Sequence, residues 1–142
     1  MYGHLTDARE IANLVNQRVP GINIGEAIKF HNGNVKLMLK LMGEFGHYYG
    51  NAASRMREAV SDNDYEAAER LAHNLHGVAG SFGASDLKDA SKALELALVH
   101  GDKQNLLGLV RSFEVALTEV LESAELLANR EVSFRASDFE AR

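Results

Sequence analysis

With 142 residues and no cysteine, the chain is long enough for one domain with a real core but has no disulfide framework, thiolate metal site or thiol nucleophile. Its net charge of −5 argues against a nucleic-acid binder, and no apolar run approaches the ~20 residues that cross a bilayer. We therefore expect a cytoplasmic protein whose partners are proteins, without direct membrane contact.

Apolar residues repeat with a period of 3.6 along most of the chain, which predicts an all-α protein. Six helical segments are expected, at residues 7–18, 24–30, 34–60, 64–82, 85–101 and 102–129. Short turns join the last four, which are strongly amphipathic, and such helices bury their apolar faces as an antiparallel up-down bundle. The sequence thus predicts a four-helix bundle with one or two additional N-terminal helices.

The breaks between segments suggest the domain organisation. Pro20-Gly21 ends the first helix, so residues 1–20 are expected to form an N-terminal helix or linker. The bundle domain is expected at residues 21–129. The chain becomes polar and loses the period from Arg130 onward, which predicts a polar C-terminal tail at residues 130–142. Within it, residues 135–142 are expected to be a loose tail or the remnant of a linker.

One helix, at residues 64–82, carries features that its packing does not require. Its apolar stripe is centred on Leu75, and His73 lies roughly 160° from that centre, so the imidazole should point into water. Gly77 and Gly80 lie near the same line, and each costs a helix interior ~1 kcal/mol relative to alanine. Glycines there would clear surface beside His73 for the close approach of another protein.

An exposed imidazole with cleared surroundings suits nucleophilic attack on phosphorus through a neutral ring nitrogen. The helix has no nucleotide-binding loop and no magnesium-binding carboxylate cluster. Activation of a phosphoryl donor, and any divalent metal, would therefore come from the partner, and no cofactor is expected in this chain.

The run from Ala72 to Ala84, AHNLHGVAGSFGA, followed by Leu87 and by Leu94-Glu95, resembles the signature of histidine phosphotransfer (HPt) domains of bacterial phosphorelays. The resemblance covers roughly residues 21–121. It implies a four-helix bundle whose exposed histidine accepts a phosphoryl group from one receiver-domain aspartate and passes it to another. It also implies a phosphoryl carrier without kinase or hydrolase activity, and allows a hybrid sensor histidine kinase, in the same or another chain, as a partner.

Carried over by position, His73 is the phosphorylated residue and Gly77 the small residue that admits the receiver. Where the family usually has lysine, three residues after the phosphorylated histidine, this chain has His76. A histidine supplies positive charge only when protonated, so we expect transfer to be slower or more sensitive to pH. Gly80, Glu69 and Arg70 are further candidates for contact with the partner or the phosphoryl group.

Simpler interpretations exist for the same residues. His73 alone could be an ordinary surface histidine, and His76 could pack against the edge of the bundle instead of facing phosphate. The two could share a metal, although no third ligand lies nearby in sequence. Glu69 and Arg70 could belong to a solvated charged face. At the level of function, the alternative is a helical adaptor that is never phosphorylated and binds a partner helix in the glycine-lined groove.

Overall fold

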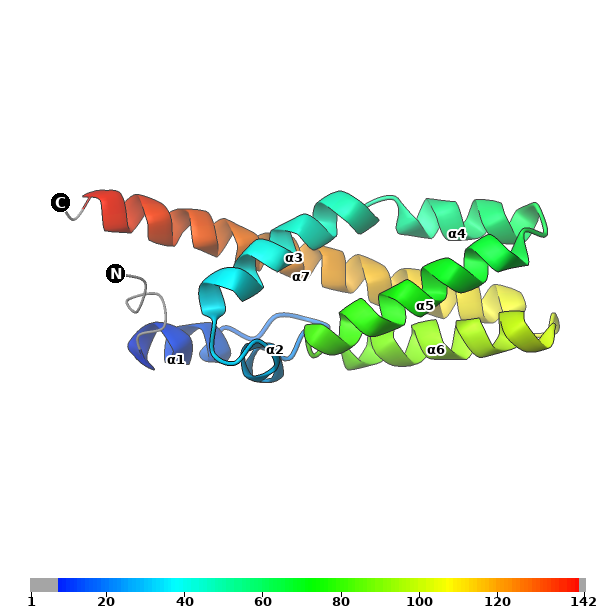
Figure 1. Cartoon of the computed structure of the whole chain (residues 1–142), viewed down its shortest axis with the longest axis horizontal. Coiled ribbons are helices and arrows are strands. Elements are labelled where there is room, and N and C mark those ends of the chain that lie inside the picture. The colour runs from blue at the N-terminus through cyan, green and yellow to red at the C-terminus, as the bar shows by residue number, and fades with distance from the viewer. Residues whose placement is uncertain (1–7, 141–142) are drawn as a thin grey trace.

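The computed structural model describes residues 8–140, and side chains are described for Arg9 and residues 11–129. The described residues form helices with no strand between them (Figure 1). In chain order the helices are α1 (Ala8–Asn16), α2 (Ile24–Phe30), α3 (Val35–Tyr49), α4 (Ala52–Ser61), α5 (Tyr65–Ser81), α6 (Ser85–His100) and α7 (Leu106–Glu140). The predicted all-α class is therefore confirmed.

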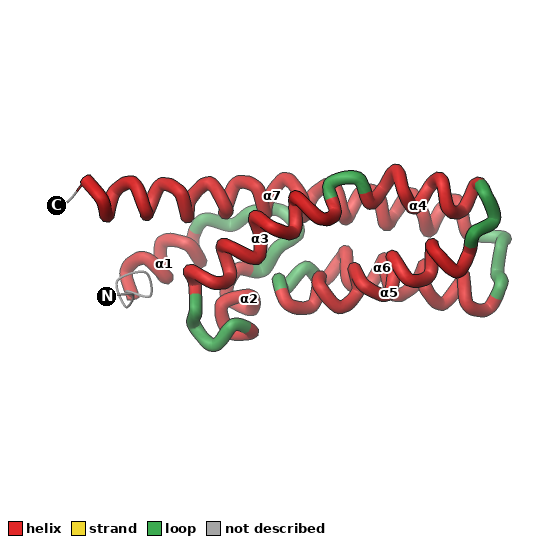
Figure 2. The backbone as a smooth tube through the Cα atoms, turned by 45° about the horizontal axis from the view of Figure 1, so that its top comes forward, coloured by secondary structure: helices red, strands yellow, loops and turns green. Residues whose placement is uncertain are grey.

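The bundle is built on α5 and α6, which lie side by side and antiparallel in both views (Figures 1 and 2). Helix α7 packs along α6, while α3 and α4 together form the fourth member against α7 and α5. Helices α1 and α2 lie at one end of the bundle, below α3 in Figure 1. This arrangement is the predicted four-helix bundle with two additional N-terminal helices.

A single apolar core holds these helices together. Helix α5 contributes the fully buried Leu75, α6 contributes Leu87 and Leu94, and α7 contributes Phe113 and Leu117. Burial of such side chains stabilises a fold by roughly 1.5–3 kcal/mol each. The same burial fixes the rotation of each helix about its own axis, and therefore determines which residues face solvent.

The predicted single helix over residues 34–60 is wrong. The chain leaves helical geometry at Asn51 (φ −106°, ψ 12°), so α3 and α4 are separate. A Cβ on Gly50 would lie 2.8 Å from the carbonyl oxygen of Gly46, which shows how tight the backbone is at this break. The apolar period continues across the break, and it therefore predicted one helix. Tyr48, near the end of α3, is 70% exposed.

The predicted loose tail is also wrong, because α7 continues past Asn129 to Glu140 and extends beyond the ends of α5 and α6 (Figure 1). Residues 109–140 contain neither glycine nor proline, so nothing stops a helix that the bundle has already nucleated. Helix α7 begins at Leu106 rather than Asp102. No helix among the described residues is long and apolar enough to cross a membrane.

The first helix is shorter than predicted. Helix α1 ends at Asn16, and residues 1–7, which include the predicted start at Asp7, lie outside the described residues. Leu14 is fully buried, whereas Val15 is 42% exposed.

The turn between α5 and α6 is fixed to the segment before α2. Gly83 has a φ of +63°, and its carbonyl accepts a hydrogen bond of 3.0 Å from the backbone N–H of Asn23. A Cβ on Gly83 would lie 2.6 Å from the carbonyl oxygen of Asn23. Only glycine fits here, because both the backbone angle and the space exclude a side chain.

We predict that Gly83→Ala lowers the free energy of unfolding by about 1–3 kcal/mol more than Gly101→Ala does. Both glycines have positive φ, but a Cβ on Gly101 would meet nothing within 4 Å. Urea unfolding followed by circular dichroism compares the two variants. Equal losses would show that the contact with Asn23 is unimportant.

Candidate functional site

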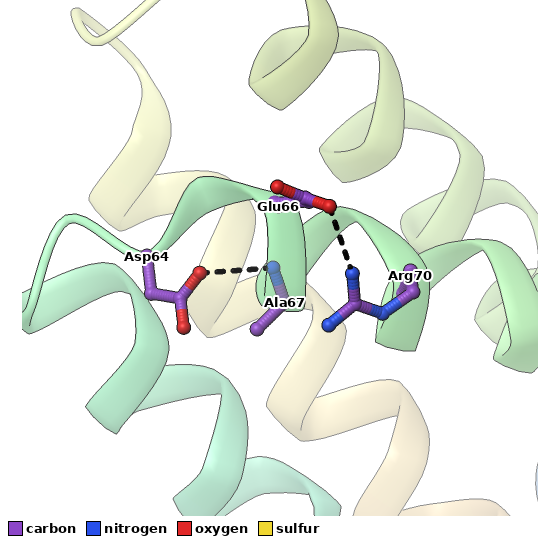
Figure 3. A network of polar contacts seen from close by, with 4 residues as sticks. All are labelled: Asp64, Glu66, Ala67 and Arg70. Carbon is purple, nitrogen blue, oxygen red and sulfur yellow. Dashed lines mark hydrogen bonds and ion pairs between the residues drawn. The ribbon is translucent and has the colours of Figure 1, made fainter.

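Helix α5 begins with a side-chain cap. The Asp64 carboxylate accepts a hydrogen bond of 3.2 Å from the backbone N–H of Ala67 (Figure 3). One turn later the Arg70 guanidinium lies 3.2 Å from the Glu66 carboxylate, in an i, i+4 pair (Figure 3). Both side chains of this pair are largely exposed. Such exposed pairs contribute little stability, so they mainly define a polar rim on this face.

His73 lies on the face of α5 opposite the core. Ala72 and Leu75 are fully buried on the other side of the helix, whereas the His73 side chain is 71% exposed. The outward position predicted from helical periodicity is therefore confirmed. Its imidazole is accessible to another protein.

A carboxylate from the neighbouring helix holds the His73 ring. Nδ1 of His73 lies 2.8 Å from Oε2 of Glu95, which is on α6 and only 13% exposed. A carboxylate only accepts hydrogen bonds, so Nδ1 carries the proton and donates. The other ring nitrogen, Nε2, then has its lone pair free and directed away from Glu95.

Open surface lies along α5 beyond His73. Gly77 is exposed, and a Cβ there would meet nothing within 4 Å. Gly80 is half-buried, and a Cβ there would meet only the Cδ of Lys88, at 4.0 Å. No packing in the structure requires a glycine at either position. The absence of a side chain at both leaves the surface of α5 on the side of His73 free of protruding groups.

His76 is turned partly inward. The residue is half-buried, and its Nε2 atom is buried without a hydrogen-bond partner. Of the two interpretations that the sequence left open, packing against the edge of the bundle fits this position better than contact with a phosphoryl group. Within the described residues, the other buried side-chain atoms without a partner are Oγ of Ser91 and Oε1 of Glu95, both on α6.

Glu69 and Arg70 occupy the turn before His73. Arg70 is exposed and paired with Glu66, and Glu69 is half-buried. Both lie near His73 along α5, but neither contacts its ring in the structure. Their roles as partner contacts stay predictions.

No group of three histidine or acidic side chains in the described part of the chain could hold a metal ion. The expectation that this chain carries no metal or cofactor of its own stays a prediction.

Sequence reasoning gave no role to Glu95 or to Lys92, whose Nζ lies 3.9 Å from Oε1 of Glu95. The ring contact joins residues 22 positions apart and depends on the register between two helices. The sequence did carry one signal, because Glu95 directly follows the buried Leu94 and therefore lies on one of the two borders of the buried face of α6.

Comparison with known proteins gives a family. The family model for the Hpt domain matches residues 41–129, which is more than half of the chain and includes α4, α5 and α6 entirely. Searches of curated proteins and of solved structures gave no significant match. The predicted resemblance is therefore confirmed, and the chain belongs to the Hpt domain family.

Proposed function

We propose that this chain relays a phosphoryl group between receiver-domain aspartates, with His73 as the residue that carries it. The observation that supports the proposal most strongly is the 2.8 Å contact between Nδ1 of His73 and Glu95, on an imidazole that is 71% exposed. The contact orients the ring and leaves Nε2 as the nucleophile. Membership of the Hpt family, which implies histidine phosphotransfer in phosphorelays, gives the reaction.

In the proposed step, the lone pair of His73 Nε2 attacks the phosphorus of a receiver's aspartyl phosphate. The N–P bond forms as the P–O bond to the aspartate breaks, and the aspartate leaves as a carboxylate. The ring keeps its proton on Nδ1 and gains positive charge, which the Glu95 carboxylate stabilises. The reverse sequence passes the phosphoryl group to another receiver.

Hpt domains act as phosphoryl carriers rather than as enzymes. We propose the same for this chain, with the receiver supplying the divalent metal that neutralises charge on the phosphoryl group. A hybrid sensor histidine kinase, in the same or another chain, is a further proposed partner. We also propose that the protein works as a monomer in the cytoplasm.

Surface clearance at Gly77 and Gly80 supports receiver docking on α5. The patch around His73 combines small residues with a polar rim that includes Arg70 and Lys92. Transient signalling contacts of this kind bury modest areas, on the low side of ~1,200 Å².

The decisive variant is His73→Gln. Incubated with a phosphorylated receiver and magnesium, wild type should gain acid-labile, base-stable phosphate and His73→Gln should gain none. Because His73 is exposed, the free energy of unfolding should change by no more than about 0.5 kcal/mol. His100→Gln, an exposed histidine at the end of α6, is the matched control and should accept phosphate normally.

Phosphate on His73→Gln would contradict the assignment of this residue. A folded wild type that accepts phosphate from none of several receivers, yet still binds a partner, would favour the adaptor function.

Gly77→Ala should separate stability from transfer. We expect it to raise the free energy of unfolding by about 0.5–1 kcal/mol, because alanine is the better helix former and the methyl group meets nothing. It should nevertheless slow transfer from a receiver, and Gly77→Leu should slow it further, because the side chain occupies the approach to His73.

The control is Gly46→Ala in α3, where an added Cβ also meets nothing within 4 Å. It should bring a similar gain in stability with no change in rapid-mixing transfer rates. If Gly77→Leu transfers as fast as Gly46→Ala, the receiver does not approach over Gly77.

A further inference from the structure

We propose that Lys92 on α6 is the cationic residue that binds the phosphoryl group on His73. This inference rests on the proposed function, because it concerns the charge that phosphorylation would bring to the same site. The phosphorylated histidine is on α5, whereas the residue proposed to bind the phosphoryl group is on the neighbouring helix α6.

Phosphorylation of Nε2 creates an electrostatic difficulty. It places a group with nearly two negative charges on a ring whose other nitrogen already contacts the Glu95 carboxylate. Glu95 is only 13% exposed, so water screens its charge weakly. Its Oε1 atom is buried and accepts no hydrogen bond. A cation near both groups would lower the free energy of the phosphorylated state.

Lys92 is the cation that the structure places there. Its Nζ lies 3.9 Å from Oε1 of Glu95, and the other oxygen of the same carboxylate contacts His73. That separation is too long for a hydrogen bond, and the side chain is 52% exposed. The ammonium group therefore lies close to the site in an ion pair with Glu95 that is longer than a hydrogen bond, and its exposed side chain has room to turn toward a phosphoryl group.

Other basic groups along the seam are less suitable. Arg70 is engaged by Glu66 at 3.2 Å, and the Nε2 atom of His76 is buried. Lys88 lies beside Gly80, which is about 10 Å along α5 from His73.

The register of the two antiparallel helices places Lys92 opposite His76. Glu95 faces His73, and Lys88 lies beside Gly80. Gly80 is seven residues after His73 on α5, and Lys88 is seven residues before Glu95 on α6, so the two helices run past each other residue for residue in opposite directions. Lys92, three residues before Glu95, therefore lies across from the residue three after His73. The seam has a positive charge at this level, supplied from α6.

The test is the equilibrium constant for phosphoryl exchange between a phosphorylated receiver and the full chain, measured for wild type, Lys92→Ala, Lys92→Arg and Lys88→Ala. Lys92→Ala should shift the equilibrium toward the phosphorylated receiver by about fivefold, the effect of one partly exposed charge contact. Lys92→Arg should keep the equilibrium constant close to that of wild type, and Lys88→Ala should match wild type. High salt should shrink the difference between Lys92→Ala and wild type.

This design distinguishes two roles of Lys92, stabilising the phosphoryl group and contacting the receiver. The equilibrium constant compares the free energies of the separate proteins, so it does not depend on how tightly they bind each other. If Lys92→Ala changes only the rate, or if Lys88→Ala shifts the equilibrium equally, the assignment of Lys92 is overturned. Those outcomes leave the proposed function intact. Failure of wild type itself to accept phosphate would instead contradict the proposed function.

Discussion

The contact between Glu95 and the Nδ1–H of His73 is the interaction on which the account of this site depends. It joins two helices, fixes the orientation of an otherwise free surface ring, and determines which nitrogen keeps the proton. Without it, His73 would be a solvated histidine with both tautomers available. With it, one nitrogen is held against a mostly buried carboxylate and the other faces the solvent.

That contact requires the correct register between α5 and α6. The short turn between them sets the register, and Gly83 anchors this turn to Asn23 through a hydrogen bond and a close backbone approach. Leu75, Leu87 and Leu94 bury the facing sides of the two helices and set their rotation. The chemistry on the surface is therefore positioned by packing underneath it, while Gly77 and Gly80 leave the approach open.

Periodicity and turn residues predicted the bundle and the outward position of His73, because each depends on local sequence. The break between α3 and α4 at Asn51 was missed because the apolar period runs through it. The extension of α7 to Glu140 was missed because a helix can continue without a buried stripe. Glu95 and Lys92 received no role because only the pairing of two helices brings them to His73. His76 was left undecided, since its angle on the helix placed it at the border of the core.

The most direct test of the account is to identify the atom that carries phosphate in the phosphorylated protein. Nitrogen-15 and phosphorus-31 NMR of a sample labelled in histidine would resolve the two ring nitrogens and detect which is bonded to phosphorus. We predict a single phosphohistidine, at His73, with phosphorus on Nε2 and the proton retained on Nδ1. Phosphorus on Nδ1 of His73, or on any other histidine, would contradict it.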